Sequence, residues 1–327
     1  THNNDCIQKI FYTQHLEGVP KSENNAGWLF STSKGVISLW QCLEHSGIKL
    51  ELVHSELIDE RILSMDIAQS SFYLITASLP QQTQYNPQNP VKAQPSITLY
   101  SLGNDAAKFL KPKGKIPLTV EPTQVLSLDS FGGPLNYSIA CSTGKHISIF
   151  DLRQAATPKA HWLAHNDIVS LLKRNPFATS LASGCWDGSV HLWDLKSKPS
   201  QPLVTLHKHA RTITSIEFLD SNNLISGSAD GSILFWDLRK ASAPVQSVVV
   251  DDKSILNCRL LSSQKVAAVA TLKGLYVMDI ATRQVKPITN PAFKVVFPDI
   301  TWNSSLASAT LYTSTMDGKI NVLSSLP

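Results

Sequence analysis

The sequence predicts an all-β protein in which one four-stranded unit occurs seven times. Two segments, 183–195 and 226–238, repeat each other 43 residues apart, and each contains Asp-Gly before a strand that ends in Trp-Asp. The position of the Trp in this pair recurs along the chain at separations of 60, 50, 43, 43, 42 and 45 residues. A period of about 40–45 residues is typical of four short strands. The residues at this position are Trp40, Tyr100, Phe150, Trp193, Trp236, Met278 and Leu323.

The opening strand of each unit gives a second, independent register. Apolar and polar residues alternate there, as a half-buried strand requires. A second strand, a turn, a third strand and an outer strand, such as 202–206 or 244–249, follow in each unit. The opening strands are expected at 7–12, 62–67, 125–129, 168–172, 213–218, 255–260 and 293–297.

Seven units in one array predict a single domain over residues 1–327. The last unit ends without an outer strand, and residues 7–12 match the innermost strand of the first unit. We therefore expect a last unit of three strands with an exposed edge, or one completed by a strand from a partner. The units are expected at 6–55, 61–120, 123–163, 167–207, 211–250, 254–288 and 292–327.

The two longest separations each contain an insertion. Residues 79–95 hold five Gln and four Pro, which predicts a mobile or extended loop that orders on binding or has no function. Residues 109–115 form the second insertion, within a lysine-rich run at 108–115. We interpret this run as a solvated loop, with a nucleic-acid or phosphate role as the alternative.

The Asp-Gly turn and the terminal Trp-Asp of segments 183–195 and 226–238 resemble the WD40 repeat. The resemblance is strong over residues 160–240 and weaker elsewhere, where blade six has Leu272 at the expected turn aspartate and blade seven keeps Thr313, Asp317 and Gly318. It implies a seven-bladed WD40 β-propeller, a fold that usually binds proteins.

The resemblance also implies a polar network in blades four and five. The indole N–H would donate to the serine, the serine to one histidine nitrogen, and the other nitrogen would pair with the turn aspartate. A hydrolase triad uses the same residue types, but a duplicated set whose serine is engaged by tryptophan favours a structural role. The residues are His165, Ser183, Asp187 and Trp193, and His209, Ser226, Asp230 and Trp236.

One face of a propeller collects the turns between second and third strands and the links between blades, where recognition residues concentrate. Trp186 precedes the turn aspartate of blade four and is a candidate contact for a partner, unless its ring lies on the neighbouring blade. The insertion at 79–95 should emerge on the same face. The other candidates for this surface are Arg211, Lys145, Lys273 and Met316.

Asp-Leu-Arg follows the third strands of blades three and five and ends at Arg153 and Arg239. Trp-Asp-x-Arg resembles the motif by which some WD40 proteins dock on the DDB1 adaptor of cullin ubiquitin ligases. Phe150 replaces the tryptophan in the first copy. In other WD40 proteins this arginine pairs with a carboxylate of its own blade, and both interpretations are open here.

Composition limits the remaining classes. Hydrophobic residues make up 43% of the 327 residues and charged residues 17%, which suffices for a core, and no apolar run is long enough to span a membrane. There is no signal segment, and five scattered cysteines predict free, buried thiols in a nuclear or cytoplasmic, reducing compartment. A net charge of +4 makes direct nucleic-acid binding an unfavoured interpretation.

Three functional classes follow. The first is a non-catalytic protein-interaction scaffold within a larger assembly, the second a substrate receptor of a cullin ubiquitin ligase, and the third a propeller hydrolase. The sequence contains no Gly-x-Ser-x-Gly elbow, phosphate-binding glycine loop, metal-ligand pair or isolated carboxylate pair. We therefore favour the scaffold, without cofactor, metal or small-molecule substrate.

Overall fold

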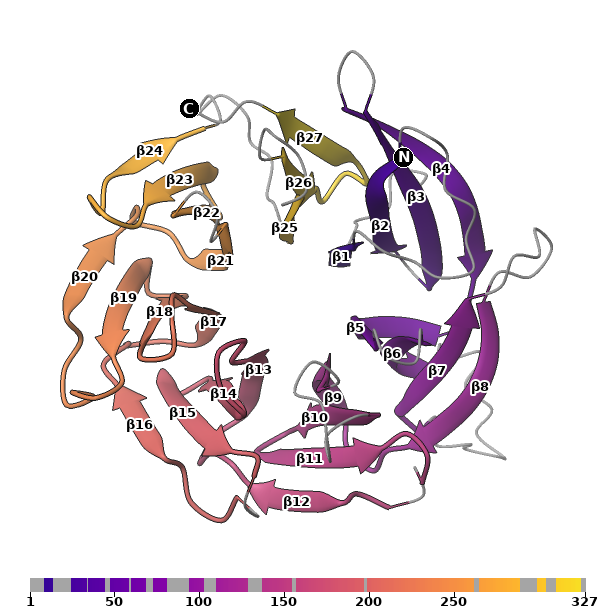
Figure 1. The fold of residues 1–327 in the computed structure, drawn as a ribbon, viewed down its shortest axis with the longest axis horizontal. Coiled ribbons are helices and arrows are strands. Elements are labelled where there is room, and N and C mark those ends of the chain that lie inside the picture. Colours follow the sequence, from indigo (N-terminus) through magenta and orange to yellow (C-terminus); the bar gives the residue numbers. More distant parts are fainter. Residues whose placement is uncertain are drawn as a thin grey trace, which may run out of the picture.

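The computed structural model forms a ring of antiparallel sheets, the blades, around a central channel (Figure 1). It describes residues 9–13, 25–33, 35–44, 48–58, 60–68, 73–80, 94–102, 110–128, 137–154, 157–196, 199–261, 265–288, 299–303 and 310–324. Within these residues, six blades have four strands and the seventh has three, in chain order from the channel outward. The described residues contain no helix that could cross a membrane.

The first three blades follow the predicted order of inner, second, third and outer strands. Blade one contains β1 (Lys9–Thr13), β2 (Asn25–Ser33), β3 (Val36–Glu44) and β4 (Ile48–Leu57). Blade two contains β5 (Glu60–Ala68), β6 (Tyr73–Pro80), β7 (Ser96–Leu102) and β8 (Leu110–Pro117). Blade three contains β9 (Pro122–Ser127), β10 (Ser138–Thr143), β11 (His146–Asp151) and β12 (Ala160–Leu163).

The other four blades repeat this order. Blade four contains β13 (Val169–Arg174), β14 (Ser180–Cys185), β15 (Ser189–Asp194) and β16 (Val204–His207), and blade five contains β17 (Ile213–Phe218), β18 (Asn223–Ser228), β19 (Ser232–Asp237) and β20 (Gln246–Val249). Blade six contains β21 (Ile255–Leu261), β22 (Val266–Thr271), β23 (Leu275–Asp279) and β24 (Val285–Pro287). Blade seven contains β25 (Ile300–Asn303), β26 (Thr310–Ser314) and β27 (Ile320–Ser324).

The residues at the recurring Trp193 position occupy equivalent positions on the third strand of every blade. Trp193 pairs with Leu181 on the second strand, and Trp236 pairs with Leu224 in the same way. Even the most divergent member, Leu323, pairs with Leu311 at the matching position of blade seven. The periodicity was therefore a correct guide in blades that lack the tryptophan.

One strand assignment made from the sequence is wrong. Residues 110–115 of the supposed insertion at 109–115 belong to β8, the outer strand of blade two, which pairs with β7 from Leu102↔Leu110 to Ser96↔Pro117. Its lysines are exposed because an outer strand turns one side to solvent, whereas Leu110 and Ile116 are buried. In blade seven the described opening strand is β25; the predicted one at 293–297 lies outside the described residues, as do residues 81–93 of the first insertion.

Adjacent blades pack face to face, which is why second strands are buried on both sides. Every residue of β14 is buried, and one of them is Gly184, where a Cβ atom would come within 2.7 Å of the Ile213 side chain in the next blade. The core between blades four and five joins Leu192 and Leu206 to Phe218 and Trp236. Small residues on the second strand thus let the next blade's inner strand approach closely.

The ring closes between blades seven and one through side chains. The backbone N–H of Ile10 donates to Oδ2 of Asp299 at 3.1 Å, and the rings of Tyr12 and Tyr312 stack with centroids 5.7 Å apart. Ile10 and Tyr312 share an apolar cluster with Leu29 and other residues of blade one. As expected from the sequence, blade seven has three strands, and within the described residues no strand pairs with the outer edge of β27.

The four described cysteines are free and buried within strands, as expected, and Cys6 lies outside the described residues. Burial raises the pKa of the Cys42 thiol to about 11 and that of Cys141 to about 12. These thiols therefore stay protonated at neutral pH and act as small apolar side chains. The other two are Cys185 and Cys258.

Candidate functional site

Blade five contains the full polar network implied by the sequence. Nε1 of Trp236 donates to Oγ of Ser226 at 2.9 Å, and this oxygen lies 2.8 Å from Nε2 of His209. Nδ1 of His209 lies 3.0 Å from Oδ2 of Asp230. Because Ser226 accepts from the indole, its hydroxyl proton points to Nε2, so His209 carries its own proton on Nδ1 and donates to the carboxylate.

Blade four departs from this arrangement at the aspartate. Trp193 donates to Ser183 at 2.9 Å and Ser183 lies 2.7 Å from Nε2 of His165, but Nδ1 of His165 meets Oγ of Ser189 at 3.0 Å. The predicted direct contact with Asp187 is therefore wrong. The carboxylate instead accepts the backbone N–H of Ser189 at 2.8 Å, so the serine hydroxyl occupies the position that Asp230 takes in blade five.

Both histidines are held neutral. Burial, together with the neighbouring His191 imidazole, lowers the pKa of His165 to about 3. Burial also lowers the pKa of His209, and this effect outweighs the opposing attraction of Asp230. The contact between His209 and Asp230 is thus a hydrogen bond from a neutral imidazole to a carboxylate, not an ion pair.

His165, Cys185 and Asp187 bring potential ligand atoms within 4.8 Å of one another. Sequence reasoning did not find this cluster because the three residues are separated by irregular spacings. Both ring nitrogens of His165 already have serine partners, and burial raises the pKa of Cys185 to about 11. His165 is thus bound through Ser183 to the Trp193 indole. The cluster therefore has a structural role in the blade.

One element of the network was missed in blade one. Nε1 of Trp40 donates to Oγ of Ser31 at 2.8 Å, as in blades four and five. Ser31 precedes Trp40 by nine positions rather than ten because the intervening turn is one residue shorter. Alignment with a one-residue gap would have revealed this pair.

The turns between second and third strands and the links between blades lie on one face, which we call the turn face. Trp186 lies in the turn of blade four with 52% of its surface exposed, so its ring does not lie under a neighbouring blade. Gly188 in the same turn has φ +84°, and a Cβ there would clash with the carbonyl oxygen of His209 in the link to blade five. The turn of blade four thus rests on the link to blade five, and the turn of blade five rests on the next link in the same way, with the Cβ position of Gly231 2.8 Å from the carbonyl oxygen of Asp251.

The structure places the other candidates on the turn face as well. Lys145 is exposed in the β10–β11 turn, Arg211 in the link before β17, and Met316, 54% exposed, in the β26–β27 turn. Lys273 is exposed in the β22–β23 turn, where Nζ lies 3.7 Å from Oδ1 of Asp252. They come from blades three to seven and line an arc of the ring rather than one cleft.

Leu272 was assigned to the wrong turn position. Its backbone N–H donates to the carbonyl oxygen of Ser254 in the link at 3.2 Å, which matches the bond from Trp186 to Ile168 at 3.0 Å. Leu272 is therefore the equivalent of Trp186, and Lys273 takes the aspartate position. Leu272 is 48% exposed.

On the opposite face, which we call the hairpin face, both candidate docking arginines are held by the aspartate of their own motif. Arg153 contacts Asp151 through Nε at 2.9 Å and Nη2 at 2.7 Å, and Arg239 contacts Asp237 through the same two atoms at 2.8 Å each. The pairing lowers the pKa of each carboxyl to about 2. The arginine side chains remain 61% and 65% exposed.

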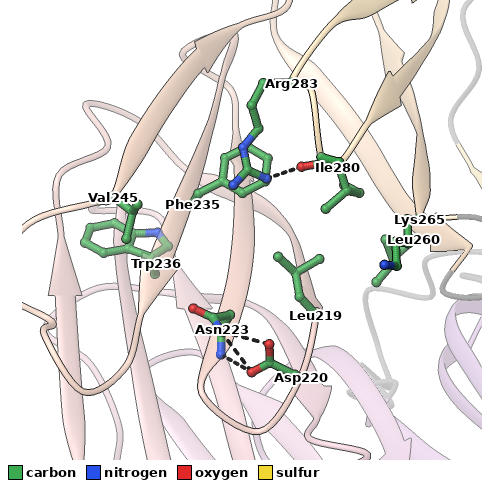
Figure 2. Close-up of a pocket in the computed structure, with 11 residues that line it drawn as sticks. Leu219, Asp220, Asn223, Phe235, Trp236, Val245, Leu260, Lys265, Ile280 and Arg283 are labelled. Atoms are coloured by element: carbon green, nitrogen blue, oxygen red, sulfur yellow. Dashed lines mark hydrogen bonds between the residues drawn. The ribbon is translucent and has the colours of Figure 1, made fainter.

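A pocket of about 420 Å³ opens on the hairpin face between blades five and six (Figure 2). No sequence motif predicts this pocket, because its lining combines strand and turn residues that share no common pattern. Apolar side chains form most of its lining, with polar side chains at the rim. The lining residues are Leu219, Asp220, Asn223, Phe235, Trp236, Val245, Leu260, Lys265, Ile280, Ala281 and Arg283.

The central channel holds a smaller cavity of about 120 Å³ lined by inner strands. Nζ of Lys173 lies 2.7 Å from Oε1 of Glu217, and Nη1 of Arg259 lies 3.5 Å from the same oxygen. These three residues occupy equivalent positions on β13, β17 and β21. Their alternating charges link the neighbouring blades four, five and six along the wall of the channel.

Comparison with protein families finds the WD40 repeat, described as "WD domain, G-beta repeat", at residues 156–194 and 200–237. Each match begins with the outer strand of one blade, β12 or β16, and ends with the third strand of the next, β15 or β19. No curated protein matches the chain. The described residues therefore form a seven-bladed β-propeller, and two of its segments match the WD40 repeat.

Proposed function

We propose that this protein is a non-catalytic protein-interaction scaffold, a subunit of a larger nuclear or cytoplasmic assembly that binds its main partner through the turn face. WD40 propellers typically bind proteins. The observation that carries the proposal is the exposure of large apolar side chains at one equivalent turn position in three blades: Trp186, Leu272 and Met316 are 52%, 48% and 54% exposed.

Exposed apolar side chains on rigid turns are suited to anchor a partner. An aromatic or Met side chain at such a site loses little backbone entropy on binding, because the turn is already fixed by its contacts with the link. Arg211 and Lys273 flank the apolar residues and would favour partners with acidic side chains at the rim of the interface.

We also propose that the protein is not an enzyme. The Ser183 and Ser226 hydroxyls each accept an indole N–H and lie beside neutral histidines in the blade interior, 0% exposed. A nucleophile must reach its substrate, and these hydroxyls do not. Buried thiols that need a reducing environment support the nuclear or cytoplasmic location.

The decisive experiment is affinity purification of the full-length protein and a Trp186→Ala, Leu272→Ala, Met316→Ala variant, followed by mass spectrometry of stoichiometric companions. We expect companions with the original protein that the variant loses. Phe177→Ala is the matched control, because Phe177 is 53% exposed in the β13–β14 turn on the hairpin face. A protein without companions, or a variant that retains them all, contradicts the proposal.

A partner strand that completes blade seven remains part of this proposal. The outer edge of β27 offers backbone groups for strand addition. In the assembled complex, amide hydrogens of residues 320–324 should exchange more slowly than in the isolated protein, while those of the outer strand β20 should not change. Equal exchange at β27 in both states would rule out strand addition there.

The second candidate is a substrate receptor of a cullin ubiquitin ligase, for which Arg153 and Arg239 are the docking residues. Each guanidinium is fixed by two hydrogen bonds yet mostly exposed, which suits a docking contact. A pull-down of the intact chain with the purified adaptor tests it: binding that Arg153→Ala and Arg239→Ala together abolish supports this role, and no binding by the original chain rejects it.

A further inference from the structure

We propose that the pocket between blades five and six is a second docking site, which binds an extended segment of a partner protein through a large apolar side chain next to a carboxylate. The site is independent of the turn face, since its walls belong to hairpins on the opposite side of the ring. Its volume of about 420 Å³ lies within the usual range for ligand sites, roughly 300–1,000 Å³.

The pocket has an apolar interior that suits an aliphatic or aromatic side chain. Phe235 and Trp236 lie at its base and are each 2% exposed, and Leu219 and Ile280 form one wall (Figure 2). Val245 stands at the opposite wall and is 65% exposed, so the mouth is open to a chain running along the surface. When a ligand places an apolar side chain in the pocket, both that side chain and Val245 are removed from water, which favours binding.

The charges around the pocket favour an acidic neighbour. Arg283 and Lys265 lie at the rim on the side of blade six, and no ion pair with a carboxylate is found for either among the described residues. The acidic residue of the lining, Asp220, is occupied by its own hairpin: it accepts the backbone N–H groups of Asn222 at 2.7 Å and Asn223 at 2.9 Å. Asp279 attracts the Arg283 guanidinium without an ion pair being found between them, so both cations remain available to pair with a ligand carboxylate.

Arg283 is already in position for such a contact. Its guanidinium lies over the Phe235 ring, 3.7 Å from the centroid, where Nη1 donates to the carbonyl oxygen of Ile280 and Nε to Oε1 of Gln246 at 3.3 Å. These contacts restrict the side chain before a ligand arrives, so less entropy is lost on binding. Desolvation lowers the pKa of Arg283, and a ligand carboxylate would offset that cost.

Two cations beside an apolar pocket do not suit a nucleic acid, which requires a basic stripe along the phosphate backbone. The two cations can bind one carboxylate of a ligand whose neighbouring apolar side chain fills the pocket. Acidic peptides with Leu, Phe or Trp next to Asp or Glu are therefore the expected ligands.

The test uses a phage-displayed library of random ten-residue peptides selected on the full-length protein, with affinities of the selected peptides measured by fluorescence anisotropy. We expect enrichment of a large apolar residue adjacent to Asp or Glu. Val245→Glu adds a like charge at the mouth and should weaken these peptides by about tenfold or more. Val249→Glu is the control, because Val249 is 71% exposed on β20 of the same blade and does not line the pocket.

A second variant separates binding from folding. Arg283 has φ +64° and Lys265 φ +54°, backbone conformations that suit glycine, so the Arg283→Gly, Lys265→Gly protein should fold. It should lose the acidic peptides and bind their Asn or Gln counterparts as the original protein does. Trp186→Ala should leave peptide binding unchanged. Selection of no consensus, of peptides without acidic residues, or of peptides that the glycine variant binds normally would overturn the proposal.

Discussion

At the residue scale, hydrogen-bond partners decide the role of the polar groups in blades four and five. Serine, histidine and aspartate could form a catalytic set, but the indole of the same blade occupies the serine. A buried polar group that keeps all its partners rigidifies a fold, and one that loses a partner destabilises it.

Trp193→Phe and His209→Ala test this network. Each removes one partner and leaves a buried polar group unpaired, so we expect the free energy of unfolding to fall by about 1–3 kcal/mol. Equilibrium denaturation by urea measures it. The exposed Trp186→Ala should unfold at nearly the original midpoint, and unchanged midpoints in both network variants would show that the hydrogen bonds contribute nothing.

The buried histidines predict acid lability. The pKa of His165 is about 3 in the folded protein and about 6.5 in an unfolded chain, so the unfolded state binds more protons between these values. Stability should therefore be constant above about pH 6.5 and fall as the pH drops, by up to about 1.4 kcal/mol per pH unit for this group. His165→Gln should flatten that slope in urea titrations from pH 7 to pH 4. If the free energy of unfolding of this variant depends on pH as steeply as that of the original protein, protonation of His165 does not cause the acid lability.

At the element scale, the tight turns depend on glycine where the next blade's link covers them. Gly188 has φ +84° and Gly144 has φ +55°, but the Cβ neighbours differ: a backbone oxygen 2.4 Å away at Gly188, and only Val120 at 3.8 Å at Gly144. The turn of blade four is therefore both conformationally and sterically restricted.

We expect Gly188→Ala to destabilise the protein by about 2–4 kcal/mol and Gly144→Ala by about 1 kcal/mol, because only the first also clashes with backbone. Thermal denaturation of both variants measures the difference. Equal effects would indicate that the link moves aside without cost.

The elements also show where local patterns fail. The lysine-rich run at 108–115 predicts a solvated loop, yet residues 110–117 form β8, because Leu110 and Ile116 pack inward while an outer strand tolerates charge on its exposed side. Leu272 was placed at the wrong position because the turn of blade six is one residue shorter, and only the backbone hydrogen bond to the link fixes the alignment.

At the scale of the whole molecule, one buried carboxylate contributes to ring closure beside the stacked tyrosines and the apolar cluster. Asp299 is 2% exposed; its Oδ2 accepts the backbone N–H of Ile10 in blade one, and its Oδ1 accepts from Nδ2 of Asn257 in blade six at 2.5 Å. One side chain thus connects three consecutive blades where the ends of the described ring meet.

Asp299→Ala should lower the free energy of unfolding by about 2–4 kcal/mol, since it leaves the buried N–H of Ile10 and the partly buried amide of Asn257 without this acceptor. Hydrogen exchange should accelerate first in β1 and β25. The control is Asp252→Ala, because Asp252 is 68% exposed on a link. Exchange that accelerates evenly around the ring would mean that the closure between blades seven and one is not the weak point.

The sequence by itself determined the number of blades, the order of their strands and the polar network of blade five, because these follow from a short period and from residues that meet within one blade. The tertiary structure alone decided the position of Ser189 at His165, the role of Asp299 and the pocket lined by Phe235 and Arg283. Each of these depends on how groups distant in the chain are oriented relative to one another, and contacts of that kind leave no periodic pattern in a single sequence.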